Sequence, residues 1–301
     1  MFSGNELAES IQELKQERKA IILAHVYQRG EIQDMADFVG DSLDLSRKAV
    51  GSDADVIVFC GVQFMAETAA ILNPSKTVLL PDRQAGCGLA DMATAEQITE
   101  YKKTAPPLDV ISYVNSSAEV KAVSDICCTS ANAINVVNSL SSDTVLFIPD
   151  KNLGSHVAEH SNKKILLWNG YCYVHEYIQP STLEGLKEAH PSAEIIVHPE
   201  CPDKVRHMAD CTGSTSQMSR YVKYSTCREF IVGTEDNFLY RLKTDNPHKQ
   251  FYPVHTLCEG MNVITLKKVK FALEKMENRV KVPEGLRVRA NNALAKMLEI
   301  S

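Results

Sequence analysis

The sequence predicts an α/β protein of three similar three-layer αβα units, whose parallel sheets are arranged around a pseudo-threefold axis. Two observations carry this prediction. Short apolar runs alternate with helix-like segments along the chain, which is typical of parallel sheets covered by helices on both faces. The pattern also recurs, since the second strand of each unit begins at Asp55, Asp143 and Glu229, which are 88 and 86 positions apart. Self-similarity at a nearly constant period indicates internal structural repeats.

The first unit is expected at residues 1–104. It opens with an amphipathic helix over 5–18, whose apolar residues recur at helical spacing. Three apolar runs are predicted to form strands, at 20–24, 55–59 and 77–80. Helices are predicted between and after them, at 31–38, 43–50, 64–72 and 96–103. Pro106 and Pro107 then end the unit, because proline interrupts a helix.

The second and third units are expected at 105–189 and 190–282, with the same order of elements. Their strands are predicted at 109–115, 143–147, 164–168, 194–200, 229–233 and 250–254. Each unit is therefore expected to contribute three strands. Residues 283–301 have apolar side chains at helical spacing, so we expect a C-terminal helix that packs back on the body.

The composition limits the class of partner. The chain has 301 residues, of which 44% are apolar, and its formal net charge of −6 argues against nucleic acid or an anionic membrane as a general partner. No apolar run approaches the roughly 20 residues of a membrane span, and the N-terminus lacks the pattern of a secretory signal. The nine cysteines are an odd number, which favours reduced thiols, metal ligation or catalysis over a disulfide framework. We expect a soluble cytoplasmic protein.

Three of the cysteines occur once per unit. Cys87, Cys172 and Cys258 are 85 and 86 positions apart, and each follows an apolar run and precedes a helix-like segment. If the units meet around an axis, the three thiols converge. Three thiolates on a soft metal leave one position open, as in a catalytic zinc site or a cubane iron–sulfur cluster. A place in the apolar core is the alternative reading of each cysteine. The others do not repeat threefold and are interpreted as structural or incidental: Cys60, Cys127, Cys128, Cys201, Cys211 and Cys227.

Polar pairs end the first strand of each unit. The two members stand two residues apart, so they point to the same side of an extended chain. The pairs are His25 and Tyr27, Tyr113 and Asn115, and His198 and Glu200. Because ligands of open parallel sheets bind beyond the carboxyl ends of the strands, these side chains are expected to ring a central cavity. Core positions for the histidines, and surface positions for Tyr27 and Glu200, are the alternative.

Glu200 is the best candidate for a general acid or base. Burial in a closed cavity can raise the pKa of a carboxyl group toward neutrality, where proton transfer is most effective. Tyr27 and His198 are further catalytic candidates. His175, three residues beyond Cys172, is a weaker one.

Hydroxyl side chains stand near three predicted helix starts. Ser42, Ser130 and Thr215 each lie fifteen residues beyond the second member of a polar pair, and Ser214 precedes the last. Such hydroxyls commonly cap helices. A helix N-terminus with free N–H groups also binds carboxylate or phosphate. Three such sites facing one cavity predict a ligand set with several anionic groups.

At these residues the sequence resembles the quinolinate synthase family over nearly its whole length. The resemblance is carried by Ile21-Ile-Leu-Ala-His25-Val-Tyr27-Gln, Ala36-Asp-Phe-Val-Gly-Asp41-Ser42, Phe64-Met-Ala-Glu67, Tyr113-Val-Asn115-Ser, Thr129-Ser130-Ala-Asn-Ala and Val197-His198-Pro-Glu200-Cys201. It implies a pseudo-threefold fold with a [4Fe-4S] cluster on Cys87, Cys172 and Cys258. The implied reaction condenses iminoaspartate with dihydroxyacetone phosphate, with loss of phosphate and water, to form quinolinate for NAD biosynthesis. A functional link to the enzyme that produces iminoaspartate is also implied.

The resemblance carries functional residues over by motif. These are His25, Tyr27, Ser42, Tyr113, Asn115, Ser130, His198, Glu200, Ser214 and Thr215. Two positions depart from the pattern, since the family usually has Asn where Val26 stands and Asp where Gln63 stands. Some bacterial members also have a CxxC redox switch at the third ligand. Here the segment ends in Met261, so that switch is expected to be absent.

Two rival functions remain at this point. One is an iron–sulfur redox or iron sensor without enzymatic activity, which would need an interaction surface that the sequence does not indicate. The other is a zinc hydrolase with three cysteine ligands. Zinc would give a colourless protein, whereas an iron–sulfur cluster absorbs visible light.

Overall fold

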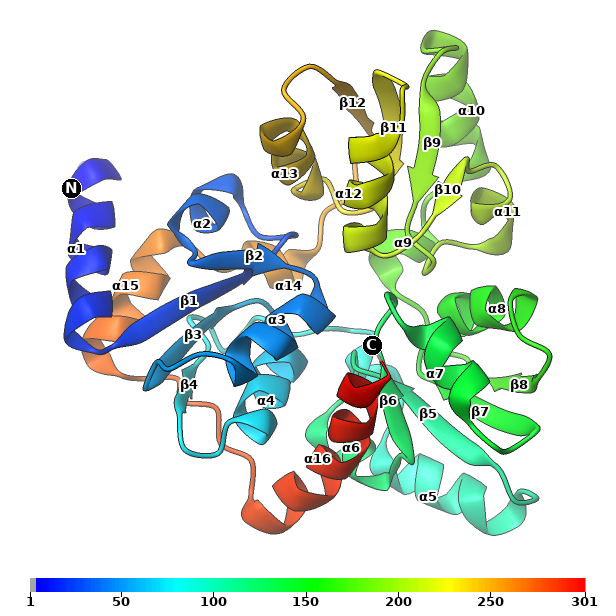
Figure 1. Ribbon diagram of the computed structural model, residues 1–301, viewed down its shortest axis with the longest axis horizontal. Helices are drawn as coiled ribbons and strands as arrows, with labels where there is room; N and C mark the ends of the chain where they lie inside the picture. The colour runs from blue at the N-terminus through cyan, green and yellow to red at the C-terminus, as the bar shows by residue number, and fades with distance from the viewer. Residues whose placement is uncertain (1–3, 301) are drawn as a thin grey trace.

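The computed structural model describes residues 4–300. It contains three four-stranded sheets, in which every strand pair is parallel. The three sheets and their helices are grouped around a common centre (Figure 1). The predicted fold class is therefore confirmed. Within the described residues, no helix combines the length and apolar character needed to cross a membrane.

The first sheet has the strand order β2-β1-β3-β4. Its strands are β1 (Ala20–His25), β2 (Phe38–Gly40), β3 (Val56–Cys60) and β4 (Thr77–Leu79). The helices in this part of the chain are α1 (Gly4–Glu17), α2 (Gly30–Met35), α3 (Ser42–Val50), α4 (Gln63–Leu72), the short 3₁₀ helix η1 (Ala90–Met92) and α5 (Ala95–Thr104). Of these, α5 packs against α6 (Ala118–Val123), next to the second sheet. All five residues of β3 are buried, as expected for a strand covered on both faces.

The second and third sheets repeat this order as β6-β5-β7-β8 and β10-β9-β11-β12. The strands are β5 (Asp109–Tyr113), β6 (Ile126–Cys128), β7 (Thr144–Ile148), β8 (Lys164–Leu167), β9 (Glu194–Val197), β10 (Cys211–Thr212), β11 (Glu229–Gly233) and β12 (Gln250–Pro253). The helices are α6 (Ala118–Val123), α7 (Ala133–Ser139), α8 (Lys151–Glu159), α9 (Tyr173–Glu176), α10 (Pro180–Ala189), α11 (Asp203–Arg206), α12 (Thr215–Tyr224), α13 (Phe238–Asp245), α14 (Glu259–Asn262), α15 (Leu266–Lys275) and α16 (Glu284–Glu299).

The prediction of three strands per unit is wrong, because β2, β6 and β10 add an edge strand to each sheet. These strands have three, three and two residues, too few to show a pattern of alternating or continuous burial. The helix predicted over 31–38 is present, but its predicted end is wrong for the same reason. α2 ends at Met35, and Phe38 already begins β2.

Partly buried polar contacts repeat with the same period and place these edge strands. Asp37, Asp125 and Asp210 precede the three edge strands. Their carboxylates accept hydrogen bonds from the backbone N–H groups of Ile22, Val110 and Ile195, at 2.7, 2.8 and 2.8 Å. Each carboxylate therefore joins the segment before an edge strand to the neighbouring central strand of its sheet. A search for acidic residues at the period of the apolar runs would have found them.

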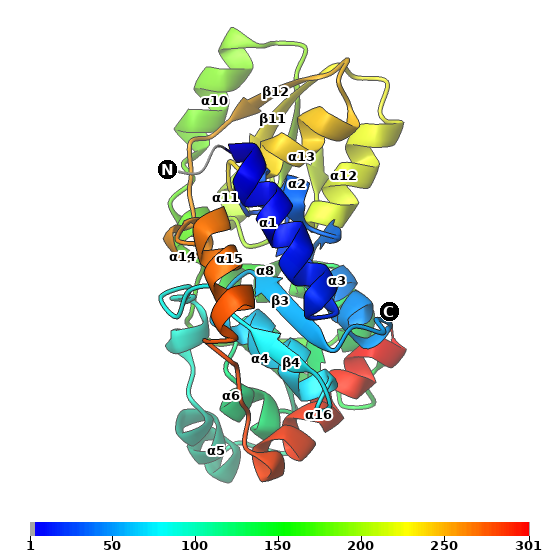
Figure 2. The same cartoon turned by 90° about the vertical axis from the view of Figure 1, so that its left-hand side faces the viewer.

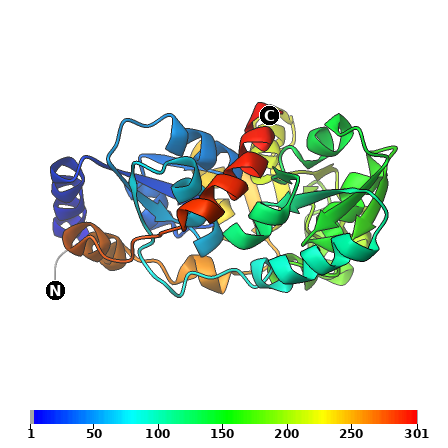
Figure 3. The same ribbon diagram turned by 90° about the horizontal axis from the view of Figure 1, so that it is seen from below.

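The last two helices join the units to one another. α15 packs against α1 and β3 of the first unit, and Figure 2 shows α1 and α15 side by side. α16 packs against α6 and β6 and also against α4, lying across the boundary of the first and second sheets (Figure 3). The buried residues of α16 are Ala290, Ala293, Leu294 and Met297. The exact boundaries of the three units remain a prediction.

Candidate active site

A single cavity lies where the three units meet. It is lined by residues that follow strands of all three sheets, as expected for ligand sites of parallel sheets. Of the thirteen residues predicted for the site, all except Ser214 line it. The lining residues that the sequence patterns did not single out as candidates include Asp41, Thr129 and Val174.

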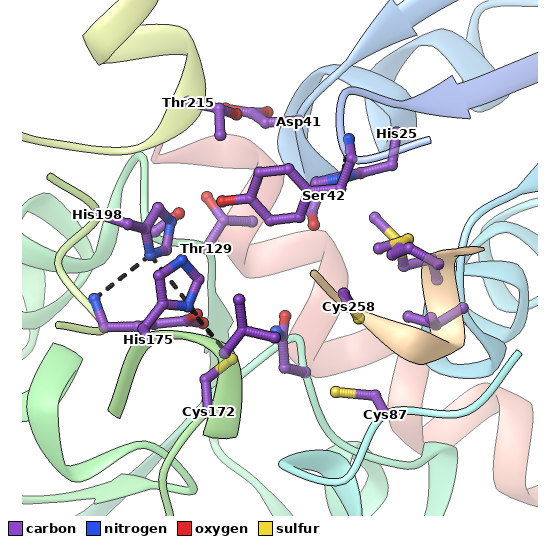
Figure 4. Close-up of a pocket in the computed structure, with 18 of the residues that line it drawn as sticks. His25, Asp41, Ser42, Cys87, Thr129, Cys172, His175, His198, Thr215 and Cys258 are labelled. Atoms are coloured by element: carbon purple, nitrogen blue, oxygen red, sulfur yellow. Dashed lines mark hydrogen bonds and ion pairs between the residues drawn. The ribbon is translucent and has the colours of Figure 1, made fainter. Parts of the chain in front are cut away.

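The three repeated cysteines face one part of this cavity. Figure 4 shows the sulfur atoms of Cys87, Cys172 and Cys258 directed toward a shared space. Burial raises the pKa of Cys87 to about 12, and it raises the pKa of Cys172 well above the usual range of a thiol. The charge of Glu200 adds to both shifts. Thiols whose pKa is raised in this way are therefore stable as thiolates only with a cation between them.

Two buried carboxylates hold the loops of these cysteines. The backbone N–H of Cys172 donates to Asp150 Oδ2 at 3.0 Å, and that of Cys258 donates to Glu235 Oε1 at 3.3 Å. Both carboxylates are fully buried. Asp150 and Glu235 each stand two residues beyond a second strand, so they too follow the repeat. This spacing is the signal by which sequence reasoning could have found them.

The loops of Cys87 and Cys258 also touch through backbone alone. A Cβ atom on Gly260 would lie 2.0 Å from the carbonyl oxygen of Gly86. Any side chain there would force the two loops apart, because neither backbone can yield by that much. Glycine at 260 is therefore needed to bring the first and third cysteines together.

A chain of hydrogen bonds connects Glu200 with Tyr27 across the three units. His175 Nδ1 lies 2.7 Å from Glu200 Oε2, and His175 Nε2 lies 2.8 Å from Thr234 Oγ1. Thr234 Oγ1 in turn lies 2.5 Å from the Tyr27 hydroxyl. His175 Nδ1 is also 3.2 Å from Cys172 Sγ. His175 is thus central to the site, although its sequence position made it only a weak candidate.

The carboxyl group of Glu200 differs from the expectation. Burial favours its neutral form, but the neighbouring imidazoles of His198 and His175 outweigh burial and lower its pKa to about 2. The predicted rise of the Glu200 pKa toward neutrality is wrong, because the prediction took account of burial and not of the two histidines beside the carboxyl group. Glu200 is a carboxylate at neutral pH. Its Oε1 atom has no hydrogen-bond partner among the described residues, which leaves an acceptor for a ligand.

His25 and His198 have equivalent positions in the first and third units. Their Nδ1 atoms accept hydrogen bonds from the backbone N–H groups of Tyr27 and Glu200, at 3.2 and 3.3 Å. Burial lowers the pKa of His25 to about 4 and that of His198 to about 3, so both rings are neutral. With Nδ1 as acceptor, Nε2 carries the proton. Each ring is therefore a hydrogen-bond donor for a ligand.

The helix starts at the cavity differ in the side chains that cap them. Asp41 caps α3, and its Oδ1 accepts from the N–H groups of Leu43 and Asp44 at 3.0 Å each. Its Oδ2 accepts from Ser216 at 2.7 Å. The hydroxyl of Ser42 lines the cavity, but the start of α3 already holds a carboxylate. Asp41 belongs to a family motif, but the sequence patterns did not assign it a role in the site.

Ser214 and Thr215 form a natural test pair at the start of α12. Ser214 Oγ accepts from Gln217 N–H at 3.3 Å, and Gln217 Oε1 accepts from Ser214 N–H at 2.8 Å, which is a complete capping box. Thr215 lines the cavity instead. The hydrogen bonds of Ser214 thus support the capping interpretation, and its role toward a ligand remains a prediction.

We expect Ser214→Ala to destabilise the fold and Thr215→Val to weaken ligand binding. Loss of the cap should cost about 1 kcal/mol of stability and leave KM unchanged. Loss of a hydroxyl that contacts an anionic group should cost about 1.5–3 kcal/mol of binding, raising KM roughly 10- to 100-fold at an unchanged melting temperature. Thermal unfolding and steady-state kinetics on both variants check this. A lowered melting temperature with normal KM for Thr215→Val would contradict a ligand-binding role.

The two departures from the family pattern lie outside the cavity lining. The backbone N–H and carbonyl of Val26 bond to Gly40 and to the Gln33 side chain, and its own side chain is buried. Gln63 donates to Glu67 at 3.0 Å. Met261, where a second cysteine would stand, does line the cavity.

Comparison with known proteins identifies the family. The family model described as quinolinate synthetase A protein matches residues 9–299. The chain belongs to the quinolinate synthase family. A quinolinate synthase of Dehalococcoides mccartyi is 54% identical over 297 residues, covering 98% of each chain. Quinolinate synthase 2 of Methanosarcina acetivorans is 52% identical over 98% of this chain and 96% of its own, and the quinolinate synthase of Desulforudis audaxviator is 50% identical over 100% of both. The family predicted from the motifs is confirmed.

Proposed function

We propose that this member of the quinolinate synthase family condenses iminoaspartate with dihydroxyacetone phosphate, releasing phosphate and water, to form quinolinate for NAD biosynthesis. One observation supports the proposal best. Three thiols and an ionised carboxylate, drawn from three different units, face the same cavity. The same proposal includes a functional link to another enzyme, because the iminoaspartate must be produced by an enzyme that supplies it to this one.

A [4Fe-4S] cluster fits the donor set. Cys87, Cys172 and Cys258 would hold it, because soft thiolates select iron–sulfur clusters and buried thiols need a cation to ionise. When bound by three cysteines, such a cluster has one iron that can act as a Lewis acid toward substrate oxygens. Zinc with three cysteine ligands remains the rival occupant.

Neutral donors would hold the anionic groups of the substrates. The described residues that line the cavity include neither lysine nor arginine. His25 and His198 offer Nε2–H donors, and Ser42, Ser130 and Thr215 offer hydroxyls. These neutral hydrogen-bond donors can therefore bind two carboxylates and a phosphate without a change in the protonation of the site residues.

The hydrogen-bond chain has a defined direction. Because the Glu200 carboxylate only accepts, His175 donates from Nδ1, and its bare Nε2 accepts from the Thr234 hydroxyl. Thr234 then accepts from the Tyr27 hydroxyl. A proton that Glu200 takes from a substrate can bind at its free Oε1 atom, while His175 keeps its own proton at Nδ1. Tyr27 is thus the donor end of the chain and Glu200 its acceptor end.

The proposal predicts a brown, active protein after anaerobic preparation. Iron and sulfide analysis should give close to four of each per chain, with broad visible absorption, and quinolinate should form only when both substrates are present. A colourless zinc protein would contradict the cluster and favour the hydrolase. A bound cluster without any quinolinate formation would favour the sensor.

A further inference from the structure

Lys121 in α6 is the largest side chain that is completely buried. Its ammonium group donates to the backbone carbonyl of Ser116 and lies 5.5 Å from the centre of the Phe64 ring. Among the described residues, no carboxylate oxygen lies within the 4.0 Å of an ion pair. A buried ammonium group without a counterion is costly, because it has lost its water without gaining an opposite charge.

This lysine lies directly behind the wall of the cavity. Phe64, which its ammonium group faces, lines the cavity, and Ser116 is the neighbour of the lining residue Asn115. On the outer side, α16 packs against α6. The position of Lys121 is therefore shielded from solvent but close to the proposed metal centre.

The charged groups around Lys121 do not pair with it. The carboxylates of Glu67 and Glu119 act on it only from beyond ion-pair distance. Glu67 instead accepts hydrogen bonds from the N–H of Ala118 and from Gln63. On the cavity side, the backbone N–H of Gln63, the neighbour of Phe64, donates to the carbonyl of Ala85 at 2.8 Å. The loop that carries Cys87 therefore lies beside the ring that Lys121 faces.

We propose that Lys121 is the buried countercharge of the metal cluster, placed behind the cavity wall to offset the net negative charge of the cluster and its three thiolates. The inference rests on the proposed function, since it needs the cluster to be bound. It assigns a role to a side chain that touches neither substrate nor iron. Net charge and nearby charges set the reduction potential of an iron–sulfur cluster. Lys121 should therefore raise that potential and strengthen cluster binding.

The test compares Lys121→Met with Lys163→Met. Lys163 also donates to backbone carbonyls, those of Leu140 and Ser142, and both variants lose one positive charge from the second unit. Lys163 stands directly before β8, at the amino end of the sheet and so away from the cavity. Both proteins are reconstituted anaerobically, and their midpoint potentials are measured by redox titration followed by electron paramagnetic resonance.

We expect the potential of Lys121→Met to shift to a more negative value, while that of Lys163→Met equals the wild type. The rise in melting temperature on cluster binding should also be smaller in Lys121→Met. An unchanged potential together with an unchanged rise would overturn the proposal and leave the proposed function intact. A wild-type protein that holds no cluster would instead overturn the proposed function.

Lys121→Gln guards against a folding defect, because its amide keeps a donor for Ser116 without the charge. A folded variant that fails to hold the cluster, while Lys163→Met holds it, supports the countercharge. If both variants at position 121 fail to fold without the cluster, Lys121 is required by the fold itself and the proposal is wrong.

Discussion

Replacing Cys172 with serine is expected to abolish stable cluster binding and with it quinolinate formation. Serine keeps the size of the side chain but removes the soft thiolate, which leaves two cysteines for an iron–sulfur site. Iron and sulfide content, visible absorption and quinolinate formation should all fall to background.

Cys227→Ser is the matched control. Its thiol donates to the backbone carbonyls of Ser192 and Glu229, outside the cavity. It should keep the iron content and activity of the wild type. Full iron, sulfide and activity in Cys172→Ser would show that the cluster assignment is wrong.

Replacing Glu200 with glutamine is expected to lower turnover by about 10²–10⁴ at normal cluster content, the scale for loss of a positioned acid or base. Glutamine can still accept from His175, but it cannot take a proton from a substrate. Because Glu200 is ionised at neutral pH, the lost function is that of a base in the resting site.

Steady-state kinetics beside a cluster spectrum measure this effect. A direct binding measurement for dihydroxyacetone phosphate should show affinity close to that of the wild type. Near-normal turnover in Glu200→Gln would assign the proton transfer to Tyr27 or to water, and Glu200 to positioning of His175. Gln179→Glu is a control for side-chain exchange of this kind, since Gln179 donates only to the carbonyl of Tyr177 at an exposed position.

The threefold organisation could be predicted because short apolar runs recur along the chain with a regular period. The edge strands could not, since three residues such as Phe38–Gly40 show no periodicity of their own. Each edge strand is held by the carboxylate that directly precedes it, which accepts from the central strand, as Asp37 accepts from the N–H of Ile22. Their existence thus depends on a tertiary contact.

The lining of the cavity was predictable for a similar reason, and its charge state was not. Tyr27 and Glu200 lie in the cavity because they follow strands, and this placement does not depend on the residues around them. The pKa of Glu200, in contrast, depends not only on His198, two residues away, but also on His175, which reaches it from the second unit. Proximity between segments far apart in the sequence is what patterns along the chain leave out.

The packing of α15 and α16 has a consequence for synthesis of the chain. α15 covers α1 and β3 with its buried Val269, Ala272 and Leu273, yet it is made long after them. During translation the first unit therefore emerges with one apolar face open. The first unit is covered only after α15 has been made. The ribosome must therefore synthesise nearly the whole chain before that apolar face is protected from aggregation.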